Sequence, residues 1–482
     1  MHMRVRFAPS PTGFLHIGNA RTAVINYLVS RKYGAKMVLR IEDTDMERST
    51  GESELSIMDD LRWMGISWDE GPDKGGEYGP YRQSERFDIY RQYTEKLLAG
   101  GKAYHCYCTK EELEETRKGA DGSTASFTYN GKCRNLSREE TQRFIDEGRK
   151  PTVRFHVPEN ETVTIKDHLK GDTQFNSNNI GGDFIIVRSD GVPVYNYIVV
   201  IDDALMNITH VVRGEDHLSN TPKQILIGKA LGLPIPEFAH MPLILGPDRS
   251  KLSKRHGITS VDLYRKEGYL PEALMNYLAM LGWATESGEE ILPFDELLKH
   301  FELDGLGKSA TVFDFQKLRW MNGQYIRSYA IPALTDLMIP YIEQAGFSPS
   351  SVPREKLESI IALLRGSCEV LSDIGRFIPI FLEDATIPDE EADAMLREDY
   401  AREIITAAAD LIDKEINAEN FAAELIHKIK DNSTQKGKKL FMPVRALVTG
   451  RLKGPDLEQA LPLIGYENIK KRISYCIKTY CS

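Results

Sequence analysis

The sequence has 482 residues, of which 41% are hydrophobic, and a formal net charge of −10. A chain of this length exceeds one ordinary hydrophobic core and predicts about three or four domains. The acidic balance excludes a uniformly basic nucleic-acid binder but remains compatible with local basic surfaces. No apolar run reaches the roughly 18 to 20 residues of a membrane span, and the N-terminus lacks a signal-peptide pattern. We expect a cytosolic, multidomain protein that acts as a monomer and does not bind a membrane.

The first 41 residues predict a βαβ unit. Residues 5–7 and 37–41 are short buried strands, and residues 20–32 have helical spacing. The connection at residues 8–18 is rich in Pro and Gly and ends where the helix begins. Ligands of open α/β sheets lie at the carboxyl ends of strands, and a helix N-terminus offers free N–H groups to an anion. This connection is therefore the first place to look for a ligand site.

From about residue 90 the pattern changes to a polar stretch that contains three of the six cysteines, with a strand at residues 151–157. We interpret it as an inserted domain. Strands at residues 184–188, 192–200 and 210–213, followed by a helix at 222–231, predict a return to the α/β sheet. Beyond residue 262 the spacing of apolar residues is helical, with interruptions at four prolines.

Two short motifs, more than two hundred residues apart, carry most of the functional information: His16-Ile17-Gly18-Asn19 and Lys251-Leu252-Ser253-Lys254-Arg255. Each one alone is ordinary, because His-x-Gly often caps a helix and a basic loop is usually just solvated. Together they resemble the two signatures of class I aminoacyl-tRNA synthetases.

The pair also makes physical sense as an adenylation site. Attack of a carboxylate on the α-phosphate of ATP builds negative charge on the phosphoryl oxygens and on the departing pyrophosphate. Lys251 and Lys254 would supply positive charge there, while His16 and the helix N-terminus after Gly18 contact the phosphates. Ser253 completes the expected ATP-binding set. Mg²⁺ would accompany ATP, without a dedicated protein site.

Four further blocks resemble glutamyl-tRNA synthetases of the bacterial type: residues 6–13, 40–45, 195–203 and 212–216. Glutaminyl enzymes share the plan but differ in the first two blocks. The resemblance implies a glutamate site formed by Arg6, Ala8, Ser10, Glu42, Tyr195 and Arg213. Arg213 would bind the side-chain carboxylate in a bidentate fork, and Glu42 would bind the α-ammonium. The alternative for Glu42 is a surface ion pair with Arg40.

Cys106, Cys108 and Cys133 resemble the zinc ligands of part of this family, in which a fourth ligand follows two residues after the third cysteine. That position is Asn135 here, a poor zinc donor. Tyr129 or His105 could complete the set. The sequence favours three reduced thiols over bound zinc.

The C-terminal half carries the expectations about tRNA. Residues 433–453 contain six basic residues and no acidic one, and they resemble the family's helical anticodon-binding domain. The resemblance implies phosphate contacts from Lys438, Lys439, Arg445 and Arg451, although some of these side chains could pack the domain core instead. Ser367 aligns with an arginine that discriminating family members use to sense the third anticodon base. Either Arg365 takes over this role from nearby, or the alignment slips by two residues, or glutamine tRNA is accepted as well.

The expected fold is an α/β nucleotide-binding, Rossmann-like catalytic domain with a parallel sheet, interrupted by an inserted α+β domain and followed by an all-α anticodon-binding domain. The expected ranges are 1–90 with 191–260 (catalytic), 91–190 (insertion, for the tRNA acceptor end), 261–325 (stem contact) and 326–482 (helical). The expected substrates are ATP, L-glutamate and glutamate tRNA. The alternatives are a non-catalytic tRNA-binding protein, a glutaminyl-type enzyme, and a truncated paralogue that modifies tRNA, which lacks the helical domain.

Overall fold

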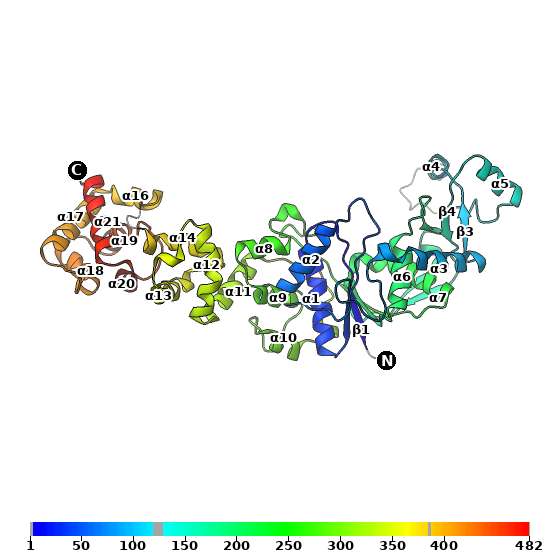
Figure 1. Cartoon of the computed structure of the whole chain (residues 1–482), viewed down its shortest axis with the longest axis horizontal. Coiled ribbons are helices and arrows are strands. Elements are labelled where there is room, and N and C mark those ends of the chain that lie inside the picture. The colour runs from blue at the N-terminus through cyan, green and yellow to red at the C-terminus, as the bar shows by residue number, and fades with distance from the viewer. Residues whose placement is uncertain (1–2, 119–128, 384–386, 482) are drawn as a thin grey trace. The chain divides into compact units, whose positions relative to one another are not determined.

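The computed structural model describes residues 3–118, 129–383 and 387–481. It divides into two compact units (Figure 1). The α/β unit comprises Met1–Leu263 and Leu274–Asp314, and the helical unit comprises Tyr264–Ala273 and Phe315–Ser482. The finer four-part division stays a prediction.

A row of parallel strands forms the centre of the α/β unit. Strand β1 (Arg4–Phe7) is followed by helix α1 (Ile17–Lys32) and by β2 (Lys36–Leu39), which pairs with β1 in parallel. Strands β8 (His210–Gly214) and β9 (Glu237–Met241) form a second parallel pair. The Thr209 N–H donates to the Arg4 carbonyl over 3.0 Å, so β8 lies beside β1. The predicted βαβ unit is confirmed, and its carboxyl edge is shared with β8 and β9.

Helix α1 begins where the Pro- and Gly-rich connection ends. The His16 side chain caps it by accepting the Gly18 N–H over 3.1 Å, and ten residues of the helix are buried. Basic Arg31 and Lys32 lie in its last turn, where cations are favourable.

The unit's other elements are α2 (Gly51–Trp63), α3 (Phe87–Ala99), α6 (Tyr195–Leu205), α7 (Thr221–Leu231), β10 (Ile244–Leu245), α8 (Val261–Glu267, shared between the units), α9 (Pro271–Met280, likewise), α10 (Phe294–His300) and β11 (Thr311–Val312).

The insertion is built on an antiparallel sheet. Its strands β3 (Ala103–Cys106), β4 (Thr152–Phe155) and β7 (Phe184–Val187) are ordered β3-β4-β7. Helices α4 (Lys110–Lys118) and α5 (Arg138–Asp146) and a hairpin of β5 (Thr162–Ile165) and β6 (Thr173–Asn176) complete it. The strand predicted at 184–188 exists as β7, but it pairs with β4 in this sheet and does not return to the parallel row.

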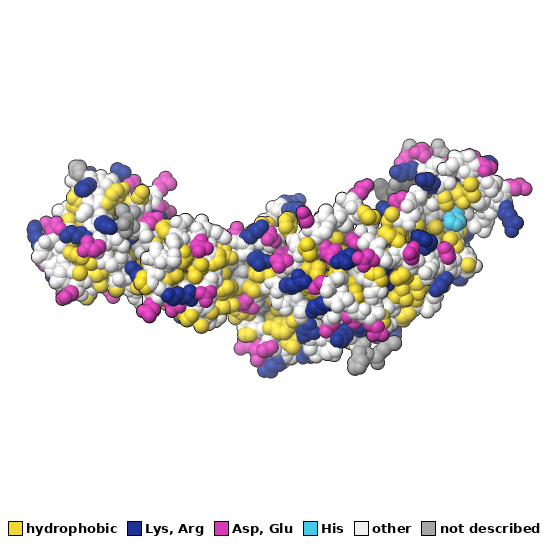
Figure 2. Space-filling model, viewed as in Figure 1, with side chains coloured by type: hydrophobic (Ala, Val, Ile, Leu, Met, Phe, Trp, Pro, Cys, Tyr) yellow, Lys and Arg dark blue, Asp and Glu magenta, His cyan; other side chains and the backbone are white. Residues whose placement is uncertain are grey.

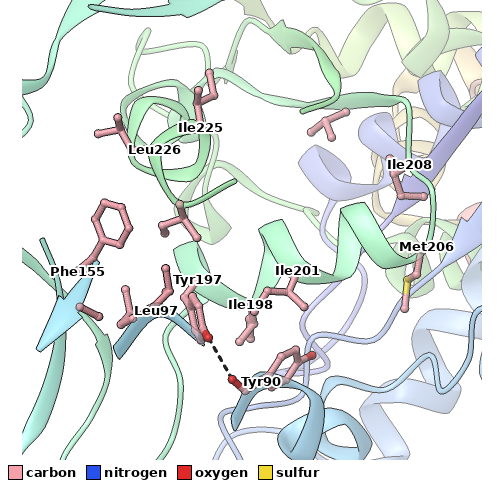
Figure 3. Packing of buried hydrophobic residues seen from close by; sticks show 14 of the residues in the cluster. Tyr90, Leu97, Phe155, Tyr197, Ile198, Ile201, Met206, Ile208, Ile225 and Leu226 are labelled. Carbon is pink, nitrogen blue, oxygen red and sulfur yellow. Dashed lines mark hydrogen bonds between the residues drawn. The ribbon is translucent and has the colours of Figure 1, made fainter. Parts of the chain in front are cut away.

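The strand predicted at residues 192–200 is wrong, because Tyr195–Leu205 is helix α6. Tyr197, Ile198 and Ile201 of this helix are buried in a core that also contains residues of α3, α7 and β4 (Figure 3). The Tyr197 hydroxyl donates to the Tyr90 carbonyl over 3.0 Å. Apolar residues occupy nearly every face of α6. A regular spacing of polar residues, which would identify a helix in the sequence, is therefore missing, and the segment resembles a buried strand.

The helical unit contains no strand among its described residues, as predicted for the C-terminal half. Its helices are α11 (Phe315–Ser328), α12 (Ile331–Gln344), α13 (Arg354–Leu364), α14 (Ile374–Phe377), α15 (Pro379–Leu382), α16 (Glu390–Leu396), α17 (Asp399–Lys414), α18 (Phe421–Asn432), α19 (Lys438–Thr449), α20 (Leu457–Ile464) and α21 (Tyr466–Tyr480). In the described part of the chain, no helix is both long and apolar enough to span a bilayer.

Candidate active site

A cleft of about 860 Å³ lies at the carboxyl edge of the parallel strands. All the residues predicted to bind ATP or glutamate line it, although they come from five separate stretches of the chain. These residues are Arg6, Ala8, Ser10, His16, Gly18, Glu42, Tyr195, Arg213, Lys251, Ser253 and Lys254. The structure thus brings the two signature motifs and the four resembling blocks to one place.

The first signature motif presents a nitrogen donor at the start of α1. Since His16 Nδ1 accepts the Gly18 N–H, the ring proton of neutral His16 resides on Nε2. Burial lowers the pKa of His16, and the ammonium groups of Lys251 and Lys254 act in the same direction. The imidazole is therefore neutral near pH 7 and can donate one hydrogen bond to an anion, next to the free N–H groups of the helix.

The second motif forms an exposed loop across the cleft. Lys251 Nζ lies 3.0 Å from the Asp216 carboxylate, at the surface. Lys254 has no ion-pair partner among the described residues, and both lysines lower the pKa of His16. The two halves of the cleft are joined through the backbone, because the Ile17 N–H donates to the Thr259 carbonyl over 2.8 Å. The loop therefore places positive charge near the N-terminus of helix α1.

The other end of the cleft contains a buried network of arginines and carboxylates. Arg6 Nε and Arg40 Nη1 both donate to Asp203 Oδ1, over 3.3 and 2.7 Å, and Arg40 Nη2 donates to Glu42 over 3.2 Å. Burial raises the pKa of Glu42, while Arg40 and Arg6 oppose the shift. Glu42 does pair with Arg40, but Arg40 is fully buried and Glu42 lines the cleft, unlike the surface ion pair considered from the sequence.

Arg213 is buried, and most of its donors are already used. Nε donates to His240, Nη2 donates to Thr221 and to Gln224 over 2.8 Å each, and Nη1 lies 3.4 Å from the Tyr195 hydroxyl. A bidentate fork needs two nitrogens facing the ligand. Only Nη1 retains an N–H for a ligand, so the expected bidentate fork does not match this arrangement. The arrangement instead favours an end-on contact beside the Tyr195 hydroxyl.

The sequence reasoning gave no role to several residues of this region. Asp203 holds Arg6 and Arg40, His217 lines the cleft, and Asp167 contacts His240 behind Arg213. Asp203 and its neighbour Asp202 are an acidic pair in an otherwise apolar run, and this pattern could have indicated a functional role. His217, Asp167 and His240 show no such local signal.

The three cysteines of the insertion lie together. The Sγ atoms of Cys106, Cys108 and Cys133 are all within 4.8 Å of one another, and the described cysteines form no disulfide. The Tyr129 hydroxyl oxygen lies 3.4 Å from Cys106 Sγ and 3.6 Å from Cys108 Sγ. Asn135 is exposed. The cluster could hold a zinc ion, and the preference for three reduced thiols over bound zinc stays a prediction.

The residues predicted to contact tRNA lie in the helical unit, and they differ in whether their side chains already bind other groups of the protein. Lys438 and Lys439 are exposed at the start of α19. Arg445 donates to the Pro455 carbonyl over 2.7 Å, and Arg451 donates to two carbonyls and lies 3.6 Å from Asp389. Ser367 is exposed at the end of a short 3-10 turn. Both lysines are exposed, although Lys439 Nζ lies 5.4 Å from the centre of the Tyr400 ring, whereas both arginines donate hydrogen bonds within their own unit.

Residues 2–320 match a family model described as the catalytic domain of class I tRNA synthetases (E and Q), and residues 333–477 match one described as an anticodon binding domain. Glutamate–tRNA ligases of Carboxydothermus hydrogenoformans and Desulforamulus reducens are each 48% identical to the chain, with 98% and 99% of the chain aligned to 99% and 100% of the relatives.

Solved structures agree with these matches. A crystal structure of a glutamate tRNA ligase from Elizabethkingia meningosepticum in complex with its amino acid covers 100% of both chains at 35% identity, with a TM-score of 0.86. The glutamate-tRNA synthetase of Elizabethkingia anophelis covers 99% of this chain and 100% of its own, with 35% identity and a TM-score of 0.85.

Proposed function

This chain belongs to the family of class I tRNA synthetases for glutamate and glutamine, and we propose that its cleft activates glutamate with ATP and passes it to the 3′ end of glutamate tRNA. Its activity is glutamate–tRNA ligation. Glutamate and ATP give enzyme-bound glutamyl-adenylate and pyrophosphate, and the terminal ribose hydroxyl of the tRNA then takes the acyl group.

The observation that carries the proposal is the convergence of an anion-binding end and a glutamate-binding end on one cleft. At the first end, the His16 Nε2–H and the N–H groups of α1 meet the phosphates. Lys251 and Lys254 neutralise the charge that develops on pyrophosphate. Mg²⁺ enters with ATP, bound through its phosphates.

The glutamate end offers both signs of charge to the substrate. The guanidinium groups of Arg6, Arg40 and Arg213 lie there with the carboxylates of Glu42 and Asp203. Glutamate carries two carboxylates and one ammonium, a net charge of minus one. Arg6 and Arg213 bind the carboxylates, and Glu42 binds the ammonium. A glutamine side chain could accept the Arg213 Nη1–H through its amide oxygen, but it carries no negative charge to offset the buried Arg213 cation, which disfavours it.

A zinc ion in the insertion is supported by the geometry of its donors. Cys106, Cys108 and Cys133 supply three thiolates, and the Tyr129 oxygen is the fourth donor. The other residue considered from the sequence, His105, is exposed and adjacent to Cys106 on strand β3, so its side chain projects from the opposite face. Zinc would fasten the segments that precede and follow helix α4, and it takes no part in adenylation.

Binding of tRNA phosphates rests on exposed cations. On the face drawn in Figure 2, Lys and Arg side chains alternate with Asp and Glu side chains, so net charge alone does not mark an RNA surface there. Lys438 and Lys439 at the start of α19 are the proposed contacts, while Arg445 and Arg451 stabilise the helical unit. This division follows from which cations already donate hydrogen bonds to other groups of the protein.

Charging of glutamine tRNA is supported by the side chain at position 367. Ser367 is exposed and has no cation to favour one anticodon base over another. Arg365, the alternative, lies 3.5 Å from the Tyr329 carbonyl through Nη1, which holds it within its own unit. Exclusion of glutamine tRNA is therefore expected to be weak.

The test of the activity is charging of purified tRNA transcripts with labelled glutamate or glutamine. Robust charging of glutamate tRNA with glutamate, and none with glutamine, is expected. The same assay with a glutamine tRNA transcript tests the relaxed specificity separately, because background signal there would leave a strictly discriminating enzyme. No charging of either transcript, together with no glutamate-dependent pyrophosphate exchange in the presence of tRNA, would favour a non-catalytic tRNA-binding protein.

A further inference from the structure

Three neighbouring strand segments bring Asp167, His240 and Arg213 into one line. Arg213 of β8 and His240 of β9 are direct register partners. Residues 166–168, from the insertion, pair with the far side of β9: the His168 N–H donates to the Phe238 carbonyl, and the Phe238 N–H donates to the Lys166 carbonyl. The Asp167 and His240 side chains are both fully buried.

The hydrogen bonds of this line determine which ring nitrogen of His240 carries a proton. Asp167 Oδ2 lies 2.5 Å from His240 Nδ1, and its Oδ1 accepts the N–H groups of Leu169 and Lys170 over 2.9 and 2.8 Å. Arg213 Nε, which can only donate, lies 3.2 Å from His240 Nε2. The two contacts are both satisfied only when Nδ1 holds the proton and Nε2 is the acceptor.

We propose that the buried Asp167–His240 pair is a positioning device for the glutamate site, which holds the Arg213 guanidinium so that its Nη1 end faces the substrate side-chain carboxylate. The proposal rests on the proposed function, since it assigns that contact to Arg213. Phe238 supports the arrangement, because its ring lies parallel to the His240 ring and 5.4 Å from Arg213 Cζ. Burial lowers the pKa of His240, and the Arg213 cation acts in the same direction.

Substitution of Asp167 by asparagine tests the proposal with almost no change in shape. Oδ1 must stay an oxygen, because it accepts two backbone N–H groups. The amide nitrogen then faces His240 Nδ1, so the ring proton moves to Nε2 and opposes the Arg213 Nε–H. We expect Asp167→Asn to raise the KM for glutamate about ten- to a hundredfold, as for loss of a buried hydrogen bond to a charged group. The KM for ATP should stay unchanged. Both constants are measured by pyrophosphate exchange with tRNA present.

A matched pair at position 240 separates positioning from general stability. In His240→Gln, the side-chain oxygen reaches the place of Nε2 and can accept from Arg213. In His240→Asn, the side chain ends near the place of Nδ1 and can reach only Asp167. Glutamate affinity should be retained better in His240→Gln than in His240→Asn. Equal losses in these two variants, or an unchanged glutamate KM in Asp167→Asn, would overturn the proposal.

The wild-type protein supplies a test that needs no variant to fold. Nitrogen NMR of the full chain, with ¹⁵N-labelled histidine and with His240 assigned through the spectrum of His240→Gln, reports the tautomer directly. Protonation at Nδ1 near neutral pH is expected, and protonation at Nε2 or at both nitrogens would refute the device. The wild-type enzyme could show this tautomer and yet not activate glutamate. In that case the proposed function is wrong, while the hydrogen bonds from Asp167 through His240 to Arg213 are confirmed.

Discussion

At the scale of single residues, the partners of each arginine determine what it can still bind. Arg40 is fully buried, and the carboxylates of Asp203, Asp202 and Glu42 raise its pKa against the penalty of burial, so it serves the network. Arg213 keeps Nη1 for a ligand. Arg6 contacts Asp203 through Nε and lines the cleft. The same residue type thus provides a structural cation and the two proposed ligand contacts within one network.

Loss of Lys254 is expected to slow adenylation without weakening glutamate binding. Lys254→Ala removes a cation that meets the charge developing on pyrophosphate, which typically costs about 3 to 4 kcal/mol, or a hundred- to a thousandfold in turnover. Pyrophosphate exchange with tRNA present gives both constants. Lys36→Ala is the control, because Lys36 is an exposed lysine at the amino end of β2. An unchanged rate in Lys254→Ala would remove this residue from the mechanism.

The environment of His217 predicts a titration well below neutral pH. Burial lowers its pKa to about 4, and the cations of Arg213 and Arg6 act in the same direction. Because the folded pKa lies below that of the unfolded chain, the neutral ring contributes stability above about pH 6.5 that is lost as the pH falls toward the folded pKa. The imidazole NMR resonances of His217 should titrate in this acidic range. That signal should be absent from His217→Gln, and a His217 titration near 6.5 would contradict the expected burial.

At the scale of elements, the insertion is where local pattern and tertiary contact diverge most. Strand β3 ends at Cys106, and the next two elements of the chain are α4 and α5, before the sheet continues with β4. Tyr129 and Cys133 return from a segment more than twenty residues later, and the Cys133 N–H donates to the Tyr129 hydroxyl over 3.0 Å. The three cysteine sulfurs and the Tyr129 oxygen are therefore brought together by tertiary contacts and not by closeness in the sequence.

Zinc analysis tests this arrangement. Purified protein is expected to contain one zinc ion per chain, measured by mass spectrometry of the metal, and Cys133→Ser should lose it. Tyr129→Phe should bind zinc more weakly, because it removes the oxygen donor and keeps the ring that packs under Arg154. Cys368→Ser is the control, since this buried cysteine lies in the helical unit. Full zinc content in Cys133→Ser would place the metal elsewhere.

At the scale of the whole molecule, we expect the two units to divide the reaction. The cleft proposed for adenylation is lined by residues of the α/β unit, whereas the match to an anticodon binding domain falls in the helical unit. Changes in the helical unit should therefore alter the use of tRNA and leave the cleft's affinity for small substrates intact. This separation makes each unit's contribution measurable by itself.

The exposed lysines of α19 provide that measurement. Replacing Lys438 and Lys439 together by alanine should raise the KM for tRNA and reduce the salt dependence of that KM, because fewer counterions are released when two phosphate contacts are lost. The KM values for ATP and glutamate should not change. Lys414 and Lys428 replaced together are the matched control, because both are ion-paired within the helical unit. If replacing Lys414 and Lys428 raised the KM for tRNA by the same amount, the effect would come from the lost positive charge in general and not from the start of α19.

What the sequence by itself determined was the chemistry that short stretches of chain contain. His16 and Gly18 lie in one helix cap, and residues 8–18 join β1 to α1, so the local sequence was enough to predict where phosphates bind. The glutamate residues were named through resemblance, and all of them line one cleft. Local reading failed at residues 192–200, where an apolar run fits both a helix and a strand until its neighbours are known.

Only the tertiary structure decided how the donors of Arg213 are shared and what stands behind it. Asp167, Arg213 and His240 are far apart in the chain, and their hydrogen bonds exist because three strand segments lie side by side. The same holds for Tyr129 beside the cysteines, and for Arg445 and Arg451, whose cations bind their own unit. The physical reason is that a hydrogen bond depends on distance and direction in space, whereas a motif records only which residue types are adjacent in the chain.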